Sequence, residues 1–369
     1  ILANLYSKPY VSLREKALPT DLCVPVKENS TPTTEAYGRA TIAEVWNIIT
    51  SDIQTALVNL KGKSTAGNRY EISYQAALAL AIRIALYMED WDRVIALGEE
   101  FRRDFASIGL YDISGKTTAG LIVNLDGIVI PKFMNTQNTE LIWTFGSRHY
   151  HGFNSILLPS TIKNDIVRYL RVSTHSNDIN TCLLDMYESG DRRKNYWFFE
   201  PVSTETVNPS LRYNYVTCKF DNKSTEHILY TCFAFRTAEV YLNLAEAYAR
   251  KSNREPDKVF ELLNALRKKR FDPAVYADLS PADYATPEAL RQLVWDERRR
   301  ELCFEELHRW WDLRRTTQPR IKHLWRNNTH YILEEGDPAY VLNFPDAELA
   351  FAGSVLVPNA RPNRSPIND

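Results

Sequence analysis

The stretch FRTAEVYLNLAEAYARKSNREPDKVFELLNALRKKR, residues 235–270, decides the fold class. Its apolar residues recur at steps of three and four, the spacing that places them on one face of an α-helix. The pattern is interrupted at SNREP (Ser252–Pro256), so it predicts two helices joined by a short turn. The residues expected on the buried faces are Ala245, Ala249, Val259, Leu262, Leu263 and Leu266. The segment therefore predicts a helical hairpin.

The N-terminal part of the chain, residues 1–106, shows the same kind of pattern. Thr41 and Glu44 form a capping-box sequence ahead of an amphipathic stretch, which predicts the start of a helix. A second helix is expected after Ser73, and a third from about Asp90. The second helix has small residues on its inner face: Ala76, Ala77, Ala81 and Ala85. Helices with small faces, joined by tight turns, resemble tetratricopeptide hairpins.

These patterns predict a mainly α-helical fold in which tetratricopeptide-like hairpins pack against a loop-rich segment with short strands. We expect one unit over residues 1–369, with four parts: the N-terminal helical part (1–106), a loop-rich insert (107–232), C-terminal helices (233–318) and a tail (319–369). The last helix is predicted from the Thr286 cap and Pro287 to about Arg315. The tail is rich in Pro and Asn and is expected to run over the surface as loop.

The composition excludes several classes of protein. Forty-five Lys and Arg against 46 Asp and Glu give a net charge of -1, which argues against a protein built to bind nucleic acid. No apolar run approaches the 18 residues of a spanning helix. The five cysteines include no CxxC pair and are expected to be small buried hydrophobic residues, with a disulfide between Cys218 and Cys232 as the alternative.

The sequence contains no familiar catalytic signature: HExxH, GxSxG, the P-loop and GxGxxG are all absent. His149 and His151 are two residues apart and would share one face of a strand, where they could begin a metal site. No carboxylate or cysteine stands at a fitting distance along the chain. We therefore expect neither a metal nor a cofactor.

The last predicted helix carries ionisable residues on its apolar face. On a helical wheel Glu297, Glu301, His308 and Arg315 share the arc of Leu290, Leu293, Val294, Phe304 and Trp311. A buried charge without a partner costs several kcal/mol, so these side chains must be paired. The sequence favours a buried ion network that joins this helix to its neighbours. A perturbed acid in a cleft is the functional alternative.

This helix resembles a signature of the SusD/RagB family of outer-membrane nutrient-binding lipoproteins. The stretch ERRRELCFEELHRWWDLRR (Glu297–Arg315) is similar to the family pattern ER-x-x-E-L-x-F-E-x-x-R-x-x-D-L-R-R. Three more stretches are similar to family motifs in the same order: TELIWTFG (Thr139–Gly146), MYESGDRRK (Met186–Lys194) and FRTAEVYLNLAEAYAR (Phe235–Arg250). With the tetratricopeptide-like start, the resemblance spans nearly the whole chain.

The resemblance implies a SusD-like, non-catalytic protein that captures an oligosaccharide, or a peptide, at the cell surface. It further implies delivery to a SusC-like TonB-dependent transporter of the outer membrane, and a lipid anchor on a cysteine that would precede Ile1. Sugar capture requires aromatic faces and a few well-placed polar groups. The residues of the insert expected to contact the ligand are Arg148, His149, Tyr150, Phe153, Asn154 and Trp197.

Two other classes of function remain open from the sequence alone. A tetratricopeptide-type scaffold would bind protein partners through a concave helical groove, but it would not need the long loop-rich insert. An all-helical glycosidase would need two carboxylates about 5 to 10 Å apart across a cleft. The sequence nominates no such pair among its 46 acidic residues, and hydrolysis of labelled oligosaccharides would distinguish this class.

Overall fold

The computed structural model describes residues 1–63, 68–116, 133–134, 138–145, 183–199, 216–217, 219, 233–324 and 329–368. Within these ranges the chain is mainly helical and its strands form short pairs, which confirms the predicted fold class. Close contacts divide it into two units, which are described separately. The first unit comprises Ile1–Lys61, Ile84–Asp90 and Leu307–Asp369, and the second comprises Gly62–Arg83 and Trp91–Glu306.

The second unit is built around a helical bundle. Its helices are α4 (Trp91–Asp104), α7 (Arg192–Trp197), α8 (Thr237–Arg250), α9 (Pro256–Lys268), α10 (Pro287–Glu301), the 3-10 turns η2 (Leu183–Met186) and η3 (Pro281–Tyr284), and most of α3 (Tyr74–Tyr87), whose end belongs to the first unit. Its strands are β3 (Leu141–Phe145), β4 (Phe198–Phe199), β5 (Val216–Thr217) and β6 (Phe233–Arg236). β3 pairs with β6 and β4 pairs with β5, both antiparallel.

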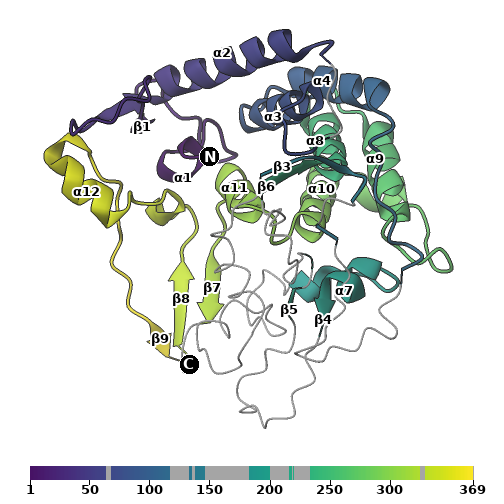
Figure 1. The fold of residues 1–369 in the computed structure, drawn as a ribbon. Helices are drawn as coiled ribbons and strands as arrows, with labels where there is room; N and C mark the ends of the chain where they lie inside the picture. Colours follow the sequence, from purple (N-terminus) through teal and green to yellow (C-terminus); the bar gives the residue numbers. More distant parts are fainter. Residues whose placement is uncertain are drawn as a thin grey trace, which may run out of the picture. The chain divides into compact units, whose positions relative to one another are not determined.

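Helix α8 is the central helix of this bundle. Helices α4, α9 and α10 all pack against it (Figure 1). Nearly every residue of α8 is buried, in keeping with a helix that is covered on several sides. The hairpin predicted over residues 235–270 is therefore confirmed, with its turn between Arg250 and Pro256.

A glycine sets the distance between α4 and α8. A Cβ atom added at Gly98 would lie 2.5 Å from Cδ2 of Leu244 on α8. Because real Cβ atoms do not approach side chains this closely, only glycine allows α4 to sit at this distance. Gly98 is thus a small residue at a close contact between two helices.

The prediction of one continuous helix from Thr286 to Arg315 is wrong. The helix begins as expected, with the Thr286 hydroxyl accepting from the Ala289 N–H at 3.1 Å, but α10 ends at Glu301. Phe304 and Glu306 then adopt left-handed backbone angles, with φ of 62° and 45°, which no helix contains. A new helix, α11 (His308–Arg315), begins in the first unit.

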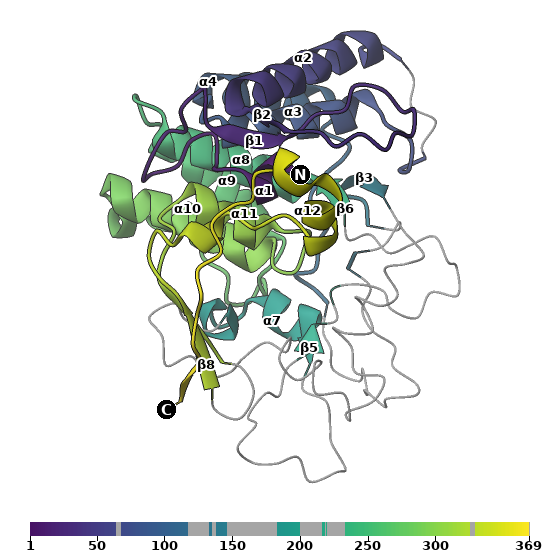
Figure 2. The same cartoon turned by 90° about the vertical axis from the view of Figure 1, so that its left-hand side faces the viewer.

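The first unit consists mainly of the N-terminal and the C-terminal parts of the chain. Its other helices are α1 (Ala3–Tyr6), α2 (Ile42–Leu60) and α12 (Asp346–Ala352), with 3-10 turns η5 (Pro338–Tyr340) and η6 (Gly353–Val355). Its strands are β1 (Leu22–Pro25), β2 (Arg39–Thr41), β7 (Ile321–Leu324), β8 (Thr329–Leu333) and β9 (Ile367–Asn368). β8 pairs with both β7 and β9 (Figure 1), and it lies close to the C-terminal end of the chain (Figure 2). The tail is thus more regular than the predicted loop.

Helix α2 begins with the predicted capping box. The Thr41 hydroxyl accepts from the Glu44 N–H at 3.2 Å, and the Thr41 N–H donates to the Glu44 carboxylate at 2.8 Å. The apolar face of α2 buries Ile42, Val45 and Ile53, as its sequence pattern indicates. None of the helices in the described ranges has the length and apolar character needed to cross a membrane.

Candidate functional site

The most prominent polar feature of the second unit is a carboxylate at the end of α10. Glu301 is completely buried, and its two oxygens accept hydrogen bonds from three arginines. Arg236 Nη1 lies 2.7 Å from Oε1, Arg193 Nη1 lies 2.9 Å from Oε2, and Arg270 reaches Oε1 with Nη2 at 2.9 Å. Such charge-assisted hydrogen bonds are stronger than neutral ones, and this carboxylate has several.

Glu297 lies one turn before Glu301, on the same face of α10, and continues the network. Its carboxylate is 2.7 Å from Arg193, 2.7 Å from Arg300 and 3.2 Å from Arg267. Four further members complete it. We call the following set the Glu301 network: Glu140, Asp191, Arg193, Lys219, Arg236, Arg267, Arg270, Glu297, Arg300, Glu301 and Glu305.

Electrostatics keeps three carboxylates of the network ionised, because the pKa values of Glu297, Glu301 and Glu305 are lowered. Burial alone would raise the pKa of Glu301, but the guanidinium groups of Arg270, Arg236 and Arg193 outweigh burial and hold that pKa well below its usual value. At Glu297 burial again raises the pKa, but the guanidinium groups of Arg193, Arg300 and Arg267 outweigh burial, so the pKa is lowered. A carboxylate that stays ionised and buried has no proton to give at neutral pH, so neither residue is suited to acid catalysis.

The network joins the described parts of the insert to α9 and α10. Glu140 directly precedes β3, and Arg236 ends β6, which pairs with β3 so that Leu141 lies opposite Arg236. Asp191 caps α7 and binds Arg193 of the same helix at 2.7 Å. Ion pairs thus hold the chain at Glu140 and Asp191, within the insert, and at Arg236, where the chain returns to the helical bundle.

An aromatic core lies within the same part of the second unit. Its buried members are Ile113, Phe133, Met134, Leu141, Leu184, Tyr187, Tyr196, Trp197, Phe198, Ala234 and Cys303. The Lys219 ammonium lies 3.9 Å from the centre of the Trp197 ring, and Phe133 packs on the same indole at 4.8 Å. Network and core together hold α7 and β4 in place.

Trp197 was expected at the ligand surface, and its position argues against that role. The side chain is completely buried, and Lys219 and Phe133 both pack on its ring. A sugar cannot stack on a ring that protein atoms already enclose. The other residues expected to bind ligand are outside the described residues: Arg148, His149, Tyr150, Phe153 and Asn154. The Cys218–Cys232 pair is also outside them.

His308 and Arg315, which the helical wheel aligned with Glu301, lie on α11 in the first unit. Because the chain turns between Glu301 and His308, one wheel cannot describe both helices. His308 is buried and its ring lies 5.5 Å from that of Trp311. Arg315 binds Asp312 at 2.6 Å. The wheel correctly marked all four residues as buried, but it grouped residues that belong to separate helices.

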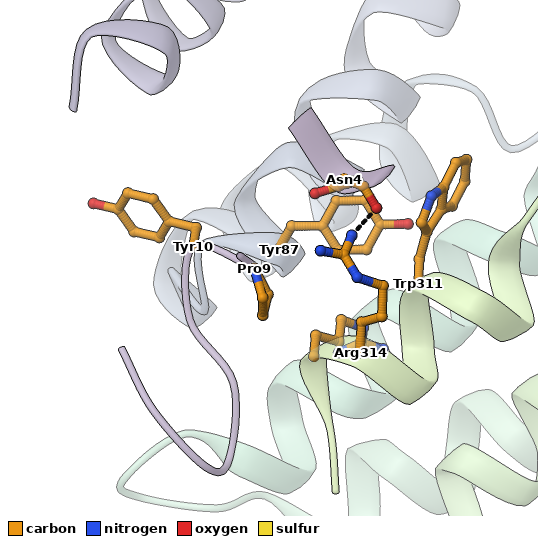
Figure 3. A pocket seen from close by; sticks show the side chains of 7 residues that line it. Asn4, Pro9, Tyr10, Tyr87, Trp311 and Arg314 are labelled. Carbon is orange, nitrogen blue, oxygen red and sulfur yellow. Dashed lines mark hydrogen bonds between the residues drawn. The ribbon is translucent and has the colours of Figure 1, made fainter. Parts of the chain in front are cut away.

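A small cavity of about 10 Å³ lies in the first unit, which is room for roughly one water molecule. It is lined by Asn4, Pro9, Tyr10, Tyr87, Trp311, Arg314 and Arg315 (Figure 3). The Arg314 guanidinium donates to the carbonyl oxygens of Asn4 and Ser7, at the end of α1. Burial lowers the pKa of Arg314 to about 10. The cavity is too small for a sugar.

Several partners in the network were not singled out from the sequence. Glu140, Lys219 and Arg270 stand far along the chain from Glu301, and no local pattern connects them to it. The available signal was the resemblance to family motifs: Asp191 and Arg193 lie in the GDRR stretch, and Glu140 lies in TELIWTFG (Thr139–Gly146). Within the described residues no group of His, Cys, Asp and Glu is arranged to hold a metal ion.

Residues 180–358 match the model of the SusD family. This matched part of the chain, which is just under half of it, is similar to the SusD/RagB family. The matched range includes α7 to α12, and with them Arg193, Arg236, Arg270, Glu297 and Glu301 of the network. The expected ligand residues Arg148–Asn154 precede it. No curated protein sequence matches the chain at a significant level.

Solved structures of the SusD superfamily share this fold. A SusD-like carbohydrate binding protein from Bacteroides vulgatus aligns over 95% of this chain and 72% of its own, with 19% identity and a TM-score of 0.61. A SusD superfamily protein from Bacteroides thetaiotaomicron aligns over 98% and 74%, with 19% identity and a TM-score of 0.67. One from Bacteroides fragilis aligns over 95% and 71%, with 20% identity and a TM-score of 0.61.

Proposed function

We propose that this SusD/RagB-like protein binds an oligosaccharide at the outer membrane, on the cell surface, and passes it unchanged to a SusC-like TonB-dependent transporter. The observation that carries the proposal is the match of residues 180–358 to the SusD family. The B. vulgatus structure that shares its fold is described as a carbohydrate binding protein, which supports a sugar ligand. The surface location, the lipid anchor and the transporter follow from the family resemblance.

The position of β3 supports a binding role for the segment Arg148–Asn154. β3 ends at Phe145, a few residues before it, and Glu140 at the start of β3 is held by Arg236 and Arg270. A binding segment that is anchored at one end by a fixed strand loses less conformational entropy when ligand binds than a segment that is not anchored. Tyr150 and Phe153 would stack on the sugar faces, and Arg148, His149 and Asn154 would bind hydroxyls.

The paired state of the buried carboxylates supports capture without hydrolysis. Glycoside cleavage needs one carboxyl group that holds a proton and a second that is ionised, both in contact with substrate. Glu297 and Glu301 are both ionised and completely buried, so this pair offers no proton donor and no contact with a substrate. Stacking and hydrogen bonds on an open surface predict a modest affinity, with a Kd between roughly 1 μM and 1 mM.

Isothermal titration calorimetry against a panel of neutral oligosaccharides tests the proposal. A Tyr150→Ala, Phe153→Ala double variant should lose binding while its melting temperature stays close to that of the wild type. The matched control is Phe351→Ala, an aromatic residue that is 59% exposed on α12, and it should bind like the wild type. Binding of peptides alone would change the ligand class, and cleavage of any glycan by the purified protein would contradict capture without turnover.

A further inference from the structure

Two carboxylates share one guanidinium group in the interior of the second unit. Arg83 on α3 binds Glu239, in the first turn of α8, through Nε at 2.6 Å and Nη2 at 2.7 Å. The same guanidinium binds Glu306, in the turn after α10, through Nη1 at 2.9 Å. The side chains of all three residues are at most 7% exposed. We call these residues the Arg83 cluster.

The surroundings of the cluster offer little further compensation for its negative charge. The backbone N–H of Ala234 on β6 donates to Glu306 Oε1 at 3.1 Å, and the Arg83 guanidinium lies 4.5 Å from the centre of the Phe235 ring. Charged groups of the Glu301 network stand close along the chain, but they bind one another: Glu305 pairs with Arg236 and Lys219. Arg83 is thus the only cation that binds the Glu239 and Glu306 carboxylates within the described residues.

We propose that Glu306 holds one exchangeable proton in the Arg83 cluster and makes the packing of α3, α8, β6 and the turn after α10 sensitive to pH. Two buried carboxylates that bind the same cation repel each other, and a proton on Glu306 removes this repulsion. With the proton bound, the cluster is neutral and holds the four elements together. When the proton is released, an uncompensated negative charge remains in the interior.

Electrostatics places this release near neutral pH. Burial is the main reason that the pKa of Glu306 is raised to about 7. The Glu239 carboxylate adds to this rise in pKa, and Arg83 offsets the rise only in part. An acid whose pKa is higher in the folded than in the unfolded state stabilises the fold at low pH, and that contribution is lost as pH rises through the folded value. Because the pKa of Glu306 shifts from 4.5 in the unfolded chain to about 7 in the folded protein, the folding equilibrium constant should fall about tenfold between pH 6 and pH 8.

The cluster lies at two positions where the chain passes from one unit to the other. Arg83 is the last residue of the second unit before Ile84, and Glu306 is its last residue before Leu307. The ion pair between them therefore fixes two exits of the chain from the second unit next to each other.

The experiment measures unfolding by urea from pH 6 to pH 8 and follows the infrared carbonyl band of a protonated carboxylic acid over the same range. In the wild type the folding constant should fall about tenfold and the band should disappear with a midpoint near pH 7. Both changes should be absent in Glu306→Gln and in Glu239→Gln, because either substitution leaves one carboxylate for one cation. Glu261→Gln, which removes an accessible carboxylate whose pKa is lowered by Arg102, should behave like the wild type.

Two results would overturn the proposal. One is a loss of stability between pH 6 and pH 8 that runs parallel in the wild type and both cluster variants. The other is a wild-type infrared spectrum without an acid band that titrates in this range. If Glu306→Gln fails to fold, Glu239→Gln and the wild-type titration still decide the matter. None of these readouts requires a ligand, so a failure here is separate from a failure of the proposed sugar binding.

Discussion

The arginines of the Glu301 network, in the second unit, and Arg314, in the first, are buried against different kinds of partner. In the second unit Arg193, Arg236 and Arg270 converge on carboxylates, and Glu301 binds all three. In the first unit Arg314 is as deeply buried, yet it donates to the backbone carbonyls of Asn4 and Ser7. One arrangement matches full charges with full charges. The other matches a full charge with the partial negative charge at the end of a short helix.

This difference determines which segments of the chain each arrangement can hold together. Each carboxylate can bind several cations at once, so the Glu301 network joins the separate segments that carry Glu140, Lys219 and α10. Arg314 binds carbonyl oxygens of one short segment, that of Asn4 and Ser7, which lies 310 and 307 residues away along the chain. The network also depends on ionisation, whereas a backbone carbonyl does not titrate. The two arrangements should therefore respond differently to acid and to mutation.

Acidification should produce the largest difference between the units. The pKa values of Glu297, Glu301 and Glu305 are all lowered in the folded state, so the folded protein binds fewer protons than the unfolded chain. The stability that they contribute is complete above about pH 4.5 and is lost as pH falls below it. Each unit of lowered pKa is equivalent to about 1.4 kcal/mol, and the carboxylates act together.

Hydrogen exchange at pH 6 and pH 3.5 measures this effect element by element. Amides of α8, α9 and α10 in the second unit should lose protection at the lower pH, and those of α11 in the first unit should lose less. Equal losses in α10 and α11 would show that buried carboxylates do not set the acid sensitivity. Exchange at pH 6 with and without 0.5 M salt serves as the control, since buried ion pairs are screened little by salt.

The next effect is the loss of one carboxylate from the network. Glu301→Ala leaves Arg193, Arg236 and Arg270 buried with too few partners, and the expected cost is about 3 to 5 kcal/mol of unfolding free energy. Urea unfolding measures it. Glu288→Ala, in the exposed first turn of the same helix, is the matched control and should cost about 1 kcal/mol or less. A melting temperature unchanged in Glu301→Ala would refute the structural role of the network.

Much of the helical architecture could be predicted from local signals. The Thr41 and Thr286 caps, the interruption at Ser252–Pro256 and the small face of α3 are encoded in neighbouring residues. The helices that these signals predict, α2, α3, α9 and α10, begin near the predicted positions. The end of α10 could not be predicted in this way. No glycine or proline stands between Glu301 and His308. The chain turns there because Glu305 and Glu306 bind Arg236 and Arg83, which are remote in sequence.

The candidate site shows the same limit more strongly. The wheel identified Glu297 and Glu301 as buried ions, but their partners come from separate segments that only the folded chain brings together. Trp197 shows the reverse error: an aromatic residue in a loop-rich insert suggests a ligand platform, yet it is part of a core that the sequence pattern did not reveal. Residue type alone does not separate a binding aromatic from a packing one.

The smallest effect concerns Arg314 in the first unit. Arg314→Met keeps the length of the side chain and removes the hydrogen bonds to Asn4 and Ser7, and it also removes a charge that is costly to bury. These effects oppose each other, so the expected net loss is about 1 to 2 kcal/mol. Hydrogen exchange should show it mainly as lost protection at the end of α1. The control is Arg361→Met, whose exposed pair with Asp346 should contribute less than about 1 kcal/mol. Arg314→Met could instead cost as much unfolding free energy as Glu301→Ala. Backbone carbonyls would then compensate a buried arginine as strongly as carboxylates do, and the distinction between the two arrangements would disappear.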